Sequence, residues 1–217
     1  MNFELLESLL KCVHHFYPIG RSSLAYSYSG CKEQDLILTN KIDELIDEVT
    51  SPWTKLVDEL KENFGDAVFD MGYLQFPSYM ARIEVGNESQ ESMSYTRTLV
   101  INISLLCPYY TIYYEDAYTF HGFYNDLSPT PPVIVFRIFF TKKNGKPEIP
   151  GKELENVQIL IQKYFRQKYI NHRILFDYDV VGGFPRTEDI STAANSYPIY
   201  SFLFDGFISY EDVEVLD

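Results

Sequence analysis

The chain has 217 residues, of which 46% are hydrophobic, and its formal net charge is −13, from 31 Asp and Glu against 18 Lys and Arg. This apolar content is enough for a packed core and excludes a disordered chain. A strongly negative chain repels nucleic acid and anionic lipid, so we expect neither as a partner. No apolar run is long enough to span a membrane.

Helices are predicted throughout the first third of the chain. Residues 6–13 carry one apolar stripe at helical spacing, which Pro18 and Gly20 close. Residues 20–33 are rich in Ser, Tyr and Gly and indicate a loop. A second apolar stripe runs over residues 38–49. Four acids lie on its opposite face: Asp43, Glu44, Asp47 and Glu48.

A third helix has the clearest boundaries in the sequence. Ser51 is a favoured N-cap, Pro52 suits the first helical position, and Gly65 suits the C-cap. The apolar stripe between them begins at Trp53 and ends at Phe64. We expect all three stripes to be core-facing.

The apolar pattern then changes to the alternation of a strand. Residues 81–85 alternate apolar and charged, which predicts a half-buried strand. A polar loop is expected over 87–94, followed by a long strand over 96–106. Pro108 interrupts this strand, and we expect it to resume over 109–114.

The second half mixes both periods. Residues 133–141 are almost wholly apolar and predict a central strand covered on both faces. Helical spacing returns over 152–168. A strand is expected over 174–178, a glycine turn over 182–185, and a strand or strand pair over 197–210.

This order of elements predicts an α+β fold. We expect N-terminal helices packed on a mainly antiparallel sheet, with one further helix at about 151–168 before the last strands. No low-complexity linker divides the sequence, so residues 1–217 are interpreted as a single globular domain.

Three cysteines, Cys12, Cys31 and Cys107, are widely spaced and form no C-x-x-C motif. They indicate reduced, mostly buried thiols. The first residues are acidic and lack the cationic start of a signal peptide, so we expect a cytoplasmic protein. The chain also has 18 Tyr, which fit either aromatic-rich strands or a binding face.

Few residues suggest chemistry. Asp177 and Asp179 lie two apart, so on a strand they would share a face that suits Mg²⁺ or Ca²⁺, although solvated side chains are the simpler interpretation. His121, close to Glu115 and Asp116, is a candidate general base. No nucleophile elbow or phosphate-binding glycine loop is present. We therefore assign no catalytic residue, metal or cofactor.

The charge is unevenly distributed. The last 41 residues hold nine carboxylates and one cation, Arg186, a local charge of −8. Residues 142–173 instead hold eight cations and three acids, a local charge of +5. We expect the helix of this stretch to be a solvated face that packs near the acidic C-terminus, or half of a self-complementary surface.

Function is inferred from this acidity. An acidic, aromatic-rich protein without catalytic motifs is similar in character to the immunity proteins that accompany secreted toxins. We therefore expect a binding protein that inhibits a basic partner. The predicted contacts are Asp177, Asp179, Glu188, Asp189, Glu211, Asp212 and Glu214. Two alternatives remain: an enzyme with a dispersed carboxylate and histidine site, and a self-associating module or homo-oligomer.

Overall fold

The fold is α+β, as the sequence predicts. The computed structural model describes residues 3–20, 28–47, 50–74, 76–90, 93–120, 133–140, 151–183, 196–204 and 214–215. Its helices are α1 (Phe3–Phe16), α2 (Ser29–Ile46), α3 (Pro52–Phe64), α4 (Gly151–Tyr164), α5 (His172–Phe176) and α6 (Ile199–Leu203). Its strands are β1 (Val68–Asp70), β2 (Ser78–Gln90), β3 (Met93–Ser104), β4 (Tyr109–Phe120), β5 (Val133–Phe140), β6 (Lys168–Tyr169), β7 (Asp179–Val181), β8 (Ser196–Pro198) and β9 (Glu214–Val215).

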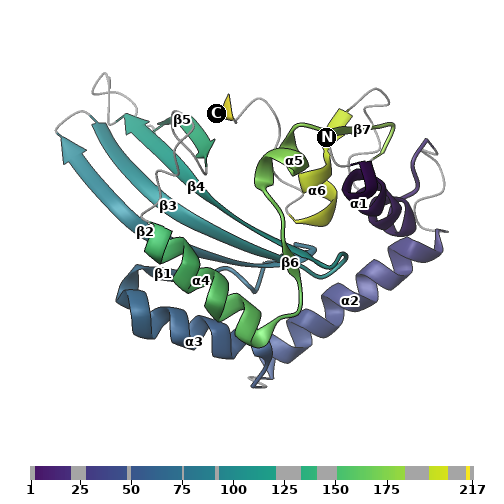
Figure 1. Ribbon diagram of the computed structural model, residues 1–217, viewed down its shortest axis with the longest axis horizontal. Helices are drawn as coiled ribbons and strands as arrows, with labels where there is room; N and C mark the ends of the chain where they lie inside the picture. The colour runs from purple at the N-terminus through teal and green to yellow at the C-terminus, as the bar shows by residue number, and fades with distance from the viewer. Residues whose placement is uncertain are drawn as a thin grey trace, which may run out of the picture.

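A mainly antiparallel sheet organises the molecule (Figure 1). Its strand order is β1-β2-β3-β4-β5-β9, and the short β6 pairs with β4. The pairs β4–β6 and β5–β9 are parallel, and the other pairs of this sheet are antiparallel. A separate two-stranded sheet joins β7 to β8.

The third predicted helix, α3, is confirmed together with its caps. The Ser51 Oγ accepts a hydrogen bond from the Thr54 backbone N–H at 3.2 Å, and the Thr54 Oγ1 accepts one from the Ser51 N–H at 2.9 Å. Gly65 follows the helix with a φ of 64°, where a side chain would be strained. Local capping chemistry therefore sets both ends of α3.

One face of the sheet packs on α3 and α4, which lie side by side (Figure 1). The buried residues of this face are apolar or aromatic: Ala81, Ile83, Leu99, Ile101, Ile103, Tyr110, Ile112 and Tyr114. Trp53 of α3 stacks on Tyr79 with ring centroids 4.9 Å apart. We call this the apolar face.

The other face packs on α1, α5 and α6. It contributes Met80, Val100 and Tyr113 to a second core, which also includes Tyr200 and Phe202 of α6. Between these apolar residues lie buried polar side chains: Ser78, Thr98, Asn102, Ser104, Thr111 and Glu115. We call this the polar face.

Two predictions for the strands are wrong. The expected polar loop at 87–94 is strand over most of its length, because β2 continues to Gln90 and β3 starts at Met93. Backbone pairing such as Asn87 with Thr96 extends the hairpin despite its polar side chains. The predicted strand at 133–141 exists as β5, but it is not central. In the described part of the chain, its outer edge pairs only with the two residues of β9.

The predicted loop at 20–33 is wrong at its end, because α2 begins at Ser29. Residues 21–27 lie outside the described chain. Gly30, taken as a loop residue, lies in the helix, where an added Cβ would come within 1.8 Å of the His15 carbonyl oxygen. This glycine therefore allows α2 to approach α1 closely and does not form a turn.

Two segments predicted as strands near the C-terminus, 174–178 and 197–210, contain short helices, although the second begins as strand β8 and its residues 205–210 lie outside the described chain. Residues 172–176 form α5, whose N-cap Asn171 accepts a hydrogen bond from the Arg173 backbone N–H at 3.0 Å. Residues 199–203 form α6, directly after the three residues of β8. Every residue of α6 is buried, so the alternation of aromatic and small residues there does not mark an inner and an outer face.

Candidate functional site

The predicted acidic contacts are only partly within the described residues. Asp177 and Asp179 are both exposed, but they do not share a strand face, because Asp177 caps α5 and Asp179 begins β7. The Asp179 carboxylate accepts a hydrogen bond from the Ser196 hydroxyl at 2.6 Å. The interpretation of Asp177 and Asp179 as a strand-borne metal pair is therefore wrong.

The structure does not describe the side chains of the other predicted contacts. Glu188, Asp189, Glu211 and Asp212 lie outside the described residues. Glu214 lies in β9, where its backbone pairs in parallel with Ile138 of β5. Whether these acids form one surface therefore stays a prediction.

The carboxylates expected to accompany His121 are held apart. His121 itself lies outside the described residues, while Glu115 and Asp116 point to opposite faces of β4. On the polar face Arg82 Nη2 lies 2.5 Å from Glu115 Oε1. On the apolar face Arg97 binds both oxygens of Asp116, at 2.8 and 2.9 Å. These two acids neutralise arginines and cannot act together.

Among the described residues, a group of buried polar side chains lies beneath α5 and α6. The Tyr113 and Tyr200 hydroxyls are 2.8 Å apart, and Asn102 Nδ2 donates to the Tyr200 hydroxyl at 3.1 Å. The His172 ring lies 5.4 Å from that of Tyr113. Within the described residues, four buried polar atoms of this group have no partner: Asn102 Oδ1, Thr111 Oγ1 and both ring nitrogens of His172.

His172 is fully buried, and this burial lowers its pKa to about 4, with the nearby Arg173 charge acting in the same direction. The imidazole is therefore neutral at pH 7. A neutral histidine can act as a base, but Asn102, Thr111, Tyr113 and Tyr200 around it are also buried, so no group of this cluster faces solvent. The cluster joins helices to sheet and offers no substrate an approach.

Hydroxyl groups fix α6 in this position. The Ser104 hydroxyl donates to the Leu203 carbonyl at 2.8 Å, and the Ser78 hydroxyl donates to the Phe204 carbonyl at 2.7 Å. Tyr17 donates to the Phe202 carbonyl at 2.7 Å. The last carbonyls of a helix lack partners within it, so these three side chains satisfy the C-terminal end of α6.

The thiols agree with the prediction of reduced, buried cysteines. All three are free, Cys31 and Cys107 are buried, and Cys12 is half-buried. Burial raises the pKa of the Cys107 thiol to about 12, so it stays protonated at neutral pH. Among the described residues no group of His, Cys, Asp and Glu side chains is arranged to hold a metal, and no helix has the length and apolar character to cross a bilayer.

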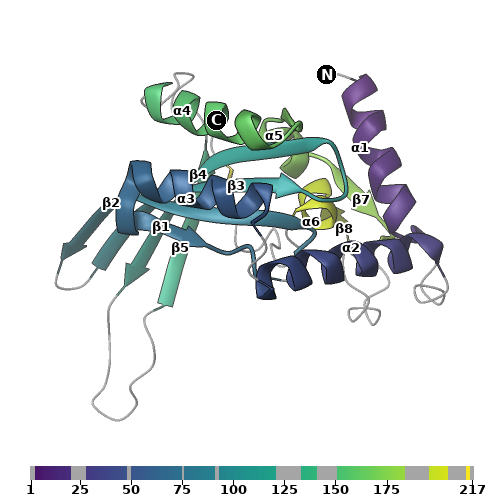
Figure 2. The same cartoon turned by 90° about the horizontal axis from the view of Figure 1, so that it is seen from below.

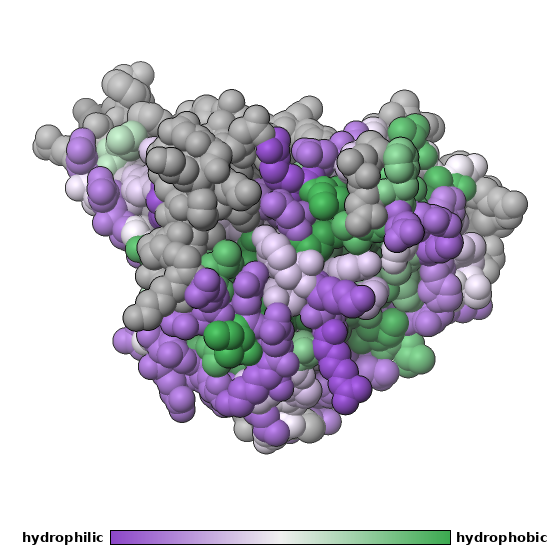
Figure 3. Space-filling model, viewed as in Figure 1, coloured by the Kyte–Doolittle hydropathy of each residue, from purple (hydrophilic) through white to green (hydrophobic). Residues whose placement is uncertain are grey.

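An acidic surface lies on α2, at the periphery of the molecule (Figure 1). Its exposed acids are Glu33, Asp35, Asp43, Glu44 and Asp47. In the described structure the last four form no ion pair. Leu36 and Ile46 are also exposed, at 60% and 71% of their surface. In Figure 3 hydrophilic and hydrophobic patches accordingly lie side by side over this helix. We call these seven residues the α2 face.

One lysine of α2 does not balance this charge at the surface. Lys41 is buried, and its Nζ donates to the carbonyl oxygens of Leu74, Phe76 and Ser78 at 2.5, 3.1 and 3.1 Å. Burial lowers its pKa to about 8. Because this cation points inward, α2 and its C-cap residue Asp47 carry five exposed acids against one exposed lysine, Lys32.

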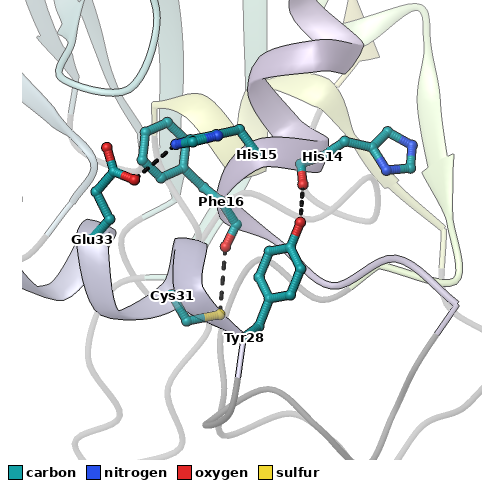
Figure 4. Close-up of polar contacts among 6 residues, drawn as sticks. All are labelled: His14, His15, Phe16, Tyr28, Cys31 and Glu33. Atoms are coloured by element: carbon teal, nitrogen blue, oxygen red, sulfur yellow. Dashed lines mark hydrogen bonds and ion pairs between the residues drawn. The ribbon is translucent and has the colours of Figure 1, made fainter.

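Contacts with α1 hold the start of α2 in place (Figure 4). The Tyr28 hydroxyl donates to the His14 carbonyl, the Cys31 thiol donates to the Phe16 carbonyl at 3.4 Å, and His15 Nε2 lies 2.8 Å from Glu33 Oε2. The His14 and His15 rings point in different directions in Figure 4, because adjacent residues of a helix are about 100° apart around its axis. These contacts fix the N-terminal end of α2, the helix that carries the α2 face.

The basic stretch is only partly as predicted. Lys163 of α4 forms an ion pair with Glu59 of α3, so this helix packs against α3. Arg166 and Lys168 are exposed, as expected of a solvated stretch. Lys142, Lys143 and Lys146 lie outside the described residues.

The sequence predicts Asp43, Glu44, Asp47 and Glu48 on the outer face of a helix; the first three are exposed, and Glu48 lies outside the described residues. The opposite stripe is not wholly core-facing as predicted, because Ile46 is 71% exposed. The sequence does not identify these acids as contacts. Helical periodicity shows neither their position beside the exposed Leu36 nor the inward direction of Lys41. Comparisons of the chain with protein-family models, curated proteins and solved structures give no match.

Proposed function

We propose that this chain is a protein-binding protein whose acidic surface docks a basic partner. The form we favour is an immunity-type inhibitor that covers the active surface of a basic toxin domain in the cytoplasm. The observation that carries the proposal is the α2 face, which has five exposed acids and two exposed aliphatic side chains, with Lys32 as the one exposed cation of the helix.

The packing of α2 supports a binding role. Only Gly30, Cys31 and Lys41 of its 18 residues are buried, and none of them is a large apolar side chain. Folding therefore leaves much of this helix available to a partner. Exposed leucine or isoleucine residues are common singly, but here two of them lie on one acidic helix.

The spacing of the α2 face suits a single contact. Leu36, Asp43 and Asp47 are at positions i, i+7 and i+11, which places them on one stripe of the helix. A basic partner would contact the acids of this stripe with its cations and bury Leu36. Such a combination of an apolar centre and a charged rim is usual for protein interfaces.

We also propose the exposed Asp177 and Asp179 as contacts. We retain Glu188, Asp189, Glu211, Asp212 and Glu214 as proposed contacts. A net charge of −13 attracts a cationic partner over distances longer than a contact, so it raises the association rate. The acids would thus steer the partner, and the apolar side chains would hold it.

Affinity capture from the source cell's lysate, at low and at high salt, tests this proposal. The bait is the intact chain, compared with Asp43→Asn/Glu44→Gln/Asp47→Asn. The matched control is Asp58→Asn/Glu62→Gln/Asp66→Asn, which removes three exposed acids around α3. We expect the chain and the control to recover one basic protein near one-to-one, which the α2 variant and high salt both reduce.

Equal recovery by both triple variants would show that total charge, and not the α2 face, selects the partner. Recovery of no basic protein by any bait would contradict the function itself. The immunity form makes a separate prediction: the captured protein should arrest growth when expressed alone, and co-expression with the intact chain should relieve the arrest.

A further inference from the structure

A shallow apolar groove lies on α1. It has a volume of about 360 Å³, and its described lining comes from α1 alone: Phe3, Leu6, Glu7, Leu10, Lys11 and His14. Figure 2 shows α1 at the edge of the molecule. Phe3 is 74% exposed, so the groove presents a large aromatic side chain to solvent.

The rim of the groove carries one acid, Glu7, and one base, Lys11, so it is complementary in charge to the same rim of a second copy. Glu7 and Lys11 lie one helical turn apart, 2.7 Å from each other, and their side chains are 65% and 73% exposed. If two copies of α1 cross antiparallel with Leu6 of one beside Leu10 of the other, Glu7 and the partner's Lys11 differ by about 3 Å along the axis. Two-fold symmetry makes this contact twice.

We propose that this groove binds a second copy of the chain, through a two-fold antiparallel pairing of α1 helices. Phe3, Leu6 and Leu10 form the apolar seam, and Glu7 and Lys11 form ion pairs across it. This inference is independent of the basic partner proposed above. A foreign partner would need an apolar ridge flanked by both charges, which α1 itself already has.

The size of the surface sets the strength of this dimer. The 14 residues of α1 span about 21 Å. A single helix face of this length buries less area than a standard stable interface, so the dimer should be weak, with a dissociation constant in the micromolar range.

Sedimentation velocity on the intact chain, from about 1 to about 500 µM, tests the proposal. We expect a reversible monomer–dimer equilibrium. Phe3→Glu should weaken it by about 30-fold or more, because an exposed aromatic contact is lost and a charge enters the seam. Since Phe3 is largely exposed, the variant should keep the thermal unfolding midpoint of the parent chain.

A charge swap tests the orientation. Lys11→Glu should weaken the dimer about threefold to tenfold by placing acids opposite one another, and Glu7→Lys/Lys11→Glu should restore it. Lys61→Glu, an equal charge change on α3, should leave it intact. A chain that stays monomeric throughout, or a dimer indifferent to Phe3→Glu, would overturn the proposal.

Two further outcomes also decide the matter. Loss of the dimer in Lys11→Glu without restoration by the swap would contradict the antiparallel pairing. A monomeric chain whose Phe3→Glu variant fails to capture the basic partner would assign the groove to that partner, leaving the proposed function intact.

Discussion

The two faces of the sheet are built from the same strands but are packed differently. The apolar face buries Leu99, Ile101 and Ile112 beneath α3 and α4. The polar face is formed by the alternate residues of the same strands, and it buries Asn102 and Thr111 beneath α5 and α6. Since alternate residues of a strand point to opposite sides, β3 and β4 supply both surfaces at once.

The difference lies in how each face holds its helices. The apolar face holds its helices mainly by burial, which is non-directional and tolerates many arrangements. The polar face uses hydrogen bonds from Ser78, Ser104 and Tyr17 to the carbonyls at the end of α6, so it fixes that helix in one orientation. It should also be the face that responds to pH and to small polar substitutions.

The largest effect should come from the apolar face. Trp53 is fully buried, and its Nε1 donates to Asp70 at 3.1 Å. Trp53→Ala should lower the free energy of unfolding by about 3–5 kcal/mol through the cavity it leaves. Chemical denaturation measures this loss, with Ile159→Ala, at a site 63% exposed, as the control expected to change it by less than about 0.5 kcal/mol.

Acid should act mainly on the polar face. The pKa of His172 is lowered by burial to about 4, so the folded protein binds fewer protons than the unfolded chain between that pH and about 6.5. The free energy of unfolding should therefore fall by about 3 kcal/mol as pH decreases through this window. The groups that face His172 are Tyr113, Phe176 and the adjacent Arg173.

Denaturation curves across this pH range test the assignment. In His172→Phe the acid-dependent loss should shrink, while Tyr113 and Phe176 retain an aromatic neighbour. An identical pH dependence in the parent chain and His172→Phe would contradict the role given to this histidine.

A single hydroxyl of the polar face should have a measurable effect. Ser104 donates to Leu203 and accepts from the backbone N–H groups of Leu106 and Cys107, both at 3.2 Å. Ser104→Ala leaves these buried groups unpaired and should cost about 1–3 kcal/mol. Hydrogen exchange of the α6 amides should rise in this variant, whereas unchanged exchange would argue against a role in fixing α6.

The smallest effect concerns Thr111. Its hydroxyl is buried without a partner among the described residues. Thr111→Val keeps the shape and removes an unsatisfied polar atom, so stability should change by less than about 1 kcal/mol or increase. A clear loss of stability in thermal unfolding would reveal a partner for this hydroxyl and would sharpen the contrast between the faces.

The sequence predicts those features that neighbouring residues determine. The caps of α3 at Ser51 and Gly65 and the break at Pro108 depend on local chemistry, and the structure confirms them. Gly30 was misinterpreted because its role is to clear the His15 carbonyl, a contact between two helices that no local pattern records. The sequence likewise predicts a strand where α6 forms, because the burial of α6 depends on contacts that no local pattern records.

The candidate site also combines features that local sequence determines with features that depend on tertiary contacts. The outer position of Asp43, Glu44 and Asp47 follows from helical spacing and could be predicted. The inward turn of Lys41 could not, because it depends on carbonyl groups more than 30 residues further along the chain. The ion pairs that engage Glu115 and Asp116 likewise depend on strand register.

The association rate of the chain with its captured partner, measured against ionic strength, tests the central claim most directly. Our account predicts that the rate of the intact chain falls at least about tenfold from low to high salt. It also predicts that Asp43→Asn/Glu44→Gln/Asp47→Asn lowers the rate at low salt and flattens this dependence. A rate that is independent of salt, or equal in this variant and the intact chain, would contradict it.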